Sequence, residues 1–175
     1  MQFFIDAFES VRDFMTMGGD VLTYIALVIF AMWALIFERL VYYRTGLKAL
    51  GEESLATWEA RSERRSWNAH AVRDGLISRY SMAANQSVPV IQTLVALCPL
   101  LGLMGTVTGM IEVFDVMAIS GTGNARSMAS GVSKATIPTM AGMVGALSGV
   151  FLITMITRTV ERKVEYIEEH MTMDH

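Results

Sequence analysis

The stretch Val95–Val113, VALCPLLGLMGTVTGMIEV, is apolar enough to cross a bilayer, yet small and hydroxylated residues recur along it. At steps of three and four, which keep residues on one face of a helix, they form a single stripe. This stripe consists of Pro99, Gly102, Thr106, Gly109 and Val113. Gly105 and Gly109 also form a GxxxG pair, which lets the backbone of another helix approach closely.

A second stretch, 135–157, repeats this design over 23 residues between Lys134 and Arg158. Apart from Glu112, next to the end of the first stretch, neither stretch contains an Asp, Glu, Lys or Arg. The pattern is compatible with plain close packing of two membrane helices, and it is also compatible with small residues lining a pore. The second small stripe consists of Ala135, Thr139, Gly142, Ala146 and Gly149.

Composition places the chain among membrane proteins. Of its 175 residues, 53% are hydrophobic and 18% are charged, against about 25% charged in soluble domains. The net charge of -3 gives no support for a nucleic-acid partner. The single cysteine, Cys98, lies inside an apolar segment, where packing is a better explanation than chemistry.

Three segments are long enough to span a bilayer, which predicts an all-α membrane protein with three transmembrane helices. We place them at residues 20–40, 88–117 and 132–157. The uncharged run from Tyr80 to Ile111 would measure about 48 Å as one helix, against a hydrocarbon core of about 30 Å. Helices two and three are therefore expected to extend into the cytoplasm, with Pro89 and Pro99 bending the second.

Basic residues predict the orientation, because cytoplasmic segments are enriched in Lys and Arg. Three spans would leave 11 of the 14 basic residues on one side, in segments 38–87 and 158–175, and 3 on the other. The amino terminus is therefore expected outside the cytoplasm, which the family resemblance below makes the periplasm, and the carboxyl terminus in the cytoplasm.

The remaining segments are predicted from local pattern. Residues 1–19 read as an amphipathic helix, which either lies at the outer, periplasmic membrane boundary or packs against a partner. Residues 41–87 read as a cytoplasmic helical segment with breaks near Gly51 and Gly75, and their length would also allow a small globular domain. Residues 118–131 form a periplasmic connector that holds the turn motif Ser120–Asn124. Residues 158–175 form a cytoplasmic helical tail that packs against copies of itself or against the cytoplasmic segment.

The chemistry available in the membrane is limited to hydroxyl groups. No catalytic pair, phosphate loop, cofactor motif or metal-ligand spacing is visible, so we expect no enzyme activity, cofactor or metal. Thr106 and Thr139 fall at depths of roughly 9 and 8 Å from the outer boundary, in the same layer. Hydroxyls do not titrate near pH 7, so a proton pathway here needs a carrier from another chain.

Outer-mouth charges are expected near the periplasmic ends of the two helices. Glu112 and Asp115 would serve either as charges at the pore mouth or, as the simpler interpretation, as solvated groups at the membrane interface. Lys134 is expected at the same depth in the membrane and is the third candidate mouth charge.

The run Pro99–Met110 resembles the second membrane helix of the ExbB/TolQ/MotA proton-channel family, and it is most similar to ExbB. The segment from Gly131 to Val144 resembles the third helix of that family, and Glu38-Arg39-Leu40 resembles the exit of the first. The sequence departs from the family at two positions, because Lys134 occupies the place of a family glutamate and Ser148 that of a family proline. Lys134 puts in doubt a role for a carboxylate at that position.

The resemblance implies a ring-forming oligomer, a pentamer, in the bacterial inner membrane. An ExbD-like single-span partner would carry an essential Asp into the pore, and proton flow would energise a TonB-like protein for outer-membrane uptake. The resemblance implies that Thr106 and Thr139 face the pore, and the small stripes predict a lining of Gly102, Gly109, Ala135, Gly142 and Ala146. The alternatives are a TolQ-like motor, a non-conducting membrane scaffold, and a substrate transporter, which the lack of a charged midplane site disfavours.

Overall fold

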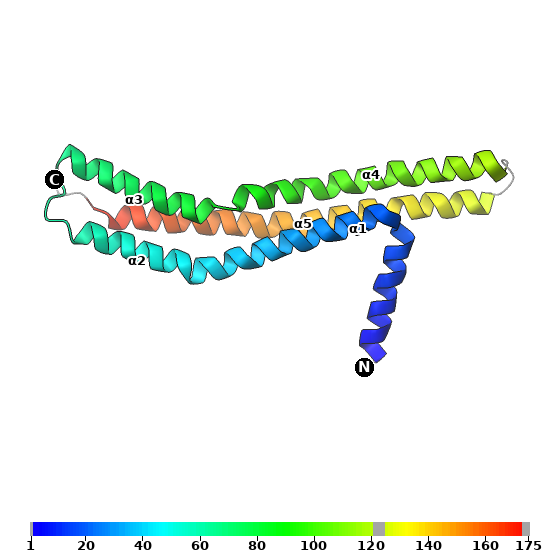
Figure 1. The fold of residues 1–175 in the computed structure, drawn as a ribbon, viewed down its shortest axis with the longest axis horizontal. Coiled ribbons are helices and arrows are strands. Elements are labelled where there is room, and N and C mark those ends of the chain that lie inside the picture. Colours follow the sequence, from blue (N-terminus) through cyan, green and yellow to red (C-terminus); the bar gives the residue numbers. More distant parts are fainter. Residues whose placement is uncertain (1, 121–124, 173–175) are drawn as a thin grey trace. The chain divides into compact units, whose positions relative to one another are not determined.

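The computed structural model describes residues 2–120 and 125–172, and every regular element within them is an α-helix. Figure 1 traces the five helices in chain order. They are α1 (Gln2–Arg44), α2 (Gly46–Glu59), α3 (Trp67–Asn85), α4 (Val88–Ser120) and α5 (Ala125–His170).

Three helical stretches among the described residues are long and apolar enough to cross a membrane, which confirms the prediction of three membrane helices. They lie within Gly18–Glu59, Trp67–Ile119 and Met128–His170. The sides of the membrane on which the segments lie stay predictions. Helices α4 and α5 extend further into the predicted connector than expected, and residues 121–124 of its turn motif lie outside the described residues.

The chain divides into two compact units. The first contains Met1–Trp33 and Thr93–Val150, and the second contains Ala34–Gln92 and Phe151–His175.

In the first unit, α1 is interrupted at Gly19, whose φ of 65° and ψ of -164° are not helical. A positive φ is accessible to glycine because it lacks a Cβ atom. The interruption falls at the end of the predicted amphipathic segment 1–19. Beyond it, one face of α1 is buried through Leu22, Ile25 and Met32, while Leu27 and Phe30 on the other face are exposed.

In the second unit, the carboxyl-terminal end of α5 packs against the segment 41–87, which was one of the two predicted alternatives. The Arg73 guanidinium donates hydrogen bonds to the carbonyl oxygens of Met171 (2.7 Å) and Glu168 (2.9 Å). The indole of Trp58 donates to the carbonyl of Thr172 (3.2 Å). These donors satisfy carbonyl groups at the helix end that have no partner within the helix.

The predicted breaks near Gly51 and Gly75 are wrong, because both glycines lie inside helices. A Cβ atom on Gly51 would lie 3.2 Å from the Tyr80 ring and 3.3 Å from Ile167, so this glycine permits close packing. The breaks fall instead at Thr45, between α1 and α2, and at residues 60–66, between α2 and α3. There, Ser66 caps α3 by accepting a hydrogen bond from the backbone N–H of Ala69.

The run from Tyr80 to Ile111, which was expected to bend at Pro89, is instead interrupted just before it, and α4 begins at the predicted residue 88. Helix α3 ends at Asn85 and α4 begins at Val88, with Ser87 at a φ of 65°. Pro89 explains the position of this break, because it has no N–H to bond the carbonyl four residues earlier but fits the first turn of a new helix. Pro99 lies within α4 and does not end it.

The segment between α2 and α3 should be sensitive to acid. Hydrogen bonds from the hydroxyl and backbone N–H of Ser66 lower the pKa of Glu63 from its ordinary value of 4.5. A lowered pKa means that the ionised carboxylate stabilises the fold above pH 4.5, and that this contribution is lost as the pH falls through the folded-state pKa. When the pH is lowered from neutral to acid, protection of the amides of residues 60–69 against hydrogen exchange should therefore fall more in the parent chain than in the Glu63→Gln variant. An identical pH response in the variant would count against this assignment.

Candidate functional site

The small stripes of α4 and α5 face each other within the chain. A Cβ atom on Gly109 would lie 2.5 Å from the Cβ of Ala135, and one on Gly102 would lie 3.0 Å from the Cα of Thr139. A Cβ on Gly142 would overlap the carbonyl oxygen of Cys98. The glycines therefore allow the two antiparallel backbones to approach more closely than any larger side chain would permit.

The two threonines lie close to this contact, and both are half-buried. The hydroxyl of Thr139 donates a hydrogen bond across the contact to the carbonyl of Gly102, at 2.9 Å. The hydroxyl of Thr106 donates to the carbonyl of Leu103 in its own helix, at 2.7 Å. Because Thr139 lies opposite Gly102, the two threonines are within about one helical turn of each other in depth.

The other residues predicted to line a pore take part in packing inside the chain. Whether they also line a pore in an assembly stays a prediction. Ala135 and Ala146 are 3% and 8% exposed, so little of either side chain is available to a pore in one copy of the chain. Gly102, Ala135, Gly142 and Ala146 are buried, and Gly109 is half-buried.

Helix α1 completes the first unit by packing against the α4–α5 pair. Cβ atoms on Gly145 and Gly149 would overlap Ile29 and Met32 of α1, and Gly105 lies beside Val21. The buried Pro138, which the sequence analysis did not single out, also fits against Gly105. All three apolar helices therefore share one packed core, to which glycines contribute close contacts.

The predicted mouth charges are all exposed. Glu112 and Lys134 line one cavity together with Asp20 of α1, whereas Asp115 is not among the residues that line it.

In the second unit, Arg39 is a charged residue that is only 4% exposed. It belongs to the Glu38-Arg39-Leu40 motif and lies on the face of α1 that buries Ile36 and Tyr43. Its Nη2 donates to the hydroxyl of Ser87 at 2.9 Å, and its Nε lies 3.1 Å from a carboxylate oxygen of Glu38.

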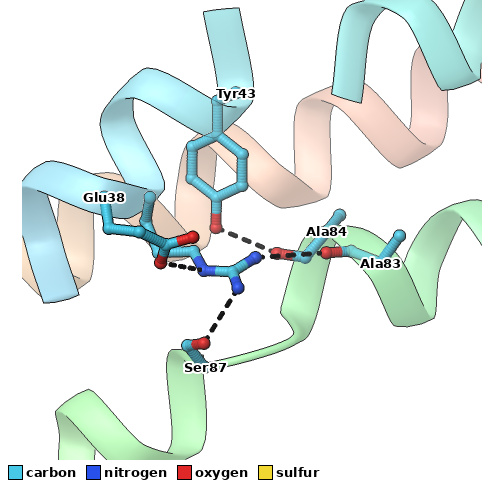
Figure 2. Close-up of polar contacts among 6 residues, drawn as sticks. Glu38, Tyr43, Ala83, Ala84 and Ser87 are labelled. Carbon is cyan, nitrogen blue, oxygen red and sulfur yellow. Dashed lines mark hydrogen bonds and ion pairs between the residues drawn. The ribbon is translucent and has the colours of Figure 1, made fainter. Parts of the chain in front are cut away.

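Figure 2 shows how this cluster closes the break between α3 and α4. The Tyr43 hydroxyl donates to the carbonyl of Ala84 at 2.9 Å, and Arg39 Nη1 makes a longer contact of 3.5 Å with the carbonyl of Ala83. Both carbonyls belong to the last turn of α3, where no intrahelical partner is available. Burial raises the pKa of Tyr43, against the opposing effect of Arg39, so the phenol remains a neutral donor at physiological pH.

Replacing Arg39 by Met should lower the free energy of unfolding by about 2–3 kcal/mol, because charge-assisted hydrogen bonds are lost and buried acceptors are left unpaired. Thermal unfolding of the purified chain in detergent measures this loss. Arg44→Met is the matched control, since Arg44 lies on the same helix but is exposed. Equal melting temperatures for the two variants would show that the buried contacts contribute nothing.

Three apolar helices define a multi-pass membrane protein. Two of them form a close pair that carries two threonine hydroxyls, and their segments 88–111 and 135–157 contain no Asp, Glu, His, Lys or Arg. The sequence model described as the MotA/TolQ/ExbB proton channel family matches residues 42–169. The chain belongs to this family, and the resemblance found in the sequence is confirmed.

Two curated relatives carry ExbB-like names, and both are from Synechocystis sp. The biopolymer transport protein ExbB-like 1 is 38% identical over 80 residues, which cover 44% of this chain and 32% of that protein. The ExbB-like 3 protein is 31% identical over 80 residues, covering 45% of this chain and 38% of that protein. The matches thus span about a third of the length of each relative.

Proposed function

We propose that this chain is the proton-channel subunit of an inner-membrane motor that uses the proton-motive force to energise TonB-dependent import across the outer membrane. Five copies would form a ring around an ExbD-like single-span partner whose Asp carries the proton. The observation that supports this proposal most strongly is the pair of hydroxyls of Thr106 and Thr139. They lie within about one turn of each other in uncharged segments of two packed helices, in a chain of a proton-channel family.

The proton carrier has to come from a partner because the membrane part of this chain offers none. The segments 88–111 and 135–157 contain no Asp, Glu, His, Lys or Arg. Threonine hydroxyls do not titrate near pH 7, but they can exchange hydrogen bonds with a carboxyl group in either of its protonation states. The chain therefore supplies a polar lining, and the partner supplies the titrating group.

Assembly is proposed because each chain leaves most of its apolar surface uncovered. In the most apolar windows of the three candidate spans, only 22%, 22% and 33% of the residues are buried. Leu103 and Val107 of α4, and Val144 and Leu147 of α5, are more than half exposed. Lipid, neighbouring copies and the partner helix would cover these faces.

The proposed orientation follows the basic residues, with the amino terminus in the periplasm and the carboxyl terminus in the cytoplasm. A TolQ-like motor for envelope maintenance would use the same arrangement. A non-conducting scaffold is the competing proposal, and it is favoured by the use of Gly102, Gly109 and Gly142 in packing inside the chain.

Proton flux into vesicles separates these proposals. Vesicles that contain this chain together with the ExbD-like partner should take up protons when a potential is imposed. The chain alone should conduct poorly, because placing a bare charge at the bilayer centre costs at least about 2.5–3.5 kcal/mol. Vesicles that contain this chain and a partner with its Asp replaced by Asn should also take up few protons. Strong conductance without the partner, or none with it, would contradict the proposal.

A further inference from the structure

The first unit contains a cavity of about 420 Å³ between the interruption of α1 and the facing ends of α4 and α5. This volume falls within the range of about 300–1,000 Å³ that is typical of small-ligand sites. Much of the lining is apolar, with Val21, Val113, Val116 and Pro138 among its residues. The cavity therefore offers apolar surface to a ligand of moderate size.

The backbone interruption at Gly19 helps to form this cavity. Gly18, Gly19 and Asp20 all line it, and the positive φ of Gly19 ends the first helical part of α1 at this point. A Cβ atom on Gly18 would overlap the side chain of Leu22, so both glycines are suited to this bend. The bend brings Asp20 to a cavity that α4 and α5 also line.

Three charged residues from three helices line the same cavity: Asp20 of α1, Glu112 of α4 and Lys134 of α5. Each lies at the end of an apolar segment, so each belongs at the level where lipid headgroups meet the hydrocarbon core. Within the part of the chain that the structure describes, no ion pair within 4.0 Å joins any two of these three residues. Their charges are therefore available to a ligand.

We propose that this cavity binds a zwitterionic phospholipid of the phosphatidylethanolamine type. The Lys134 ammonium group would bind the lipid phosphate, and the carboxylates of Asp20 and Glu112 would accept hydrogen bonds from the lipid ammonium group. The glycerol and the upper parts of the acyl chains would lie along the apolar lining. The proposal requires that the chain crosses a membrane, but it does not depend on the proton-channel function.

Charge and hydrogen bonding distinguish this lipid from others. With two carboxylates and one ammonium group, the cavity has a net negative charge, which disfavours an anionic headgroup. A choline headgroup has the same net charge as ethanolamine, but its quaternary nitrogen has no N–H to donate to a carboxylate. The cavity therefore selects for a primary ammonium group beside a phosphate.

Native mass spectrometry of the purified full-length assembly tests this selection, with dioleoyl lipids that differ only in their headgroups. Phosphatidylethanolamine should be retained about tenfold more strongly than phosphatidylglycerol or phosphatidylcholine, as expected for one charge-assisted hydrogen bond. Equal retention of the three lipids would show ordinary boundary lipid and overturn the proposal. Displacement by soluble phosphoethanolamine at an equal concentration would also overturn it, because the acyl chains would then contribute nothing.

Matched variants connect this selectivity to the cavity. Lys134→Gln and Glu112→Gln should each reduce the retention of phosphatidylethanolamine about tenfold, by the loss of one charged contact. Arg126→Gln and Asp115→Asn should leave it unchanged, since both residues are exposed and neither lines the cavity. Size-exclusion profiles identical to the parent chain would establish that the variants assemble.

An unchanged retention in assembled Lys134→Gln would overturn the proposal. The proposal would also fail if no lipid were retained and a cysteine at Val116 crosslinked to a second copy of the chain. That result would identify protein, not lipid, as the occupant of the cavity.

Discussion

Proton flux that depends on the partner should fall about tenfold or more when Thr106 and Thr139 are both replaced by valine. In the structure each hydroxyl donates its proton to a backbone carbonyl, at 2.7 Å for Thr106 and 2.9 Å for Thr139. Their oxygen lone pairs remain able to accept a hydrogen bond from a protonated carboxyl, and rotation of the hydroxyl can supply a donor to the ionised form. Losing about 1.4 kcal/mol of this stabilisation in the rate-limiting step corresponds to a tenfold lower rate.

Valine is close to threonine in size, so assembly and partner binding should survive the change. The bond from Thr139 to Gly102 crosses the helix contact, but such bonds in membranes contribute only about 0.6 kcal/mol on average. Thr136→Val is the matched control, since its hydroxyl also bonds its own helix, to Ser133, but the residue is exposed and outside the small stripe. Thr→Ser at positions 106 and 139 should retain most of the flux. If the assembled double valine variant conducted protons at the wild-type rate, both threonines would contribute only to packing.

The contact between α4 and α5 should be disrupted by a single methyl group at Gly142. The added Cβ atom would overlap the carbonyl oxygen of Cys98, and a backbone atom can move away only if the helices separate. Overpacking of this kind costs about 1–3 kcal/mol, and we expect Gly142→Ala to lie at the upper end. Separation would also lengthen the neighbouring bond from Thr139 to Gly102.

Gly145→Ala provides the comparison, because it adds the same atom three residues later in α5. Its Cβ would meet the Ile29 side chain, whose far end can rotate away, so the loss should be smaller than for Gly142→Ala. Melting temperatures and the fraction of assembled protein in detergent measure both effects. A Gly142→Ala variant as stable as Gly145→Ala would show that the backbones are not in close contact.

The membrane helices could be predicted from sequence because their determinants are local. Long apolar runs bounded by Asp20, Glu38, Glu112, Lys134 and Arg158 define where a helix can be surrounded by lipid. The small stripes likewise predicted residues that pack closely, and the structure places Gly102, Gly109, Ala135, Thr139 and Gly142 between α4 and α5, whereas Pro99 is exposed. Sequence alone left open whether such stripes serve packing or a pore, because both require small side chains.

The helix breaks could be predicted only in part, because distant residues act on them together with local ones such as Pro89 and Ser66. Gly51 remains helical since it packs against Tyr80 and Ile167, which lie 29 and 116 positions away in the chain. The break before α4 is stabilised by Arg39 and Tyr43 from α1. A signal for Arg39 was nevertheless present, because it continues the buried face of α1 at helical spacing between Ile36 and Tyr43.

Disulfide crosslinking from Thr106 tests most directly whether the proposed partner's carboxyl group lies beside the two threonines. A cysteine at Thr106 and a second cysteine in place of the partner's essential Asp should crosslink in membranes, whereas one at Phe30, which is 76% exposed on α1, should not. Crosslinking through Phe30 with none at Thr106 would place the partner on the outer face of α1 and contradict the account.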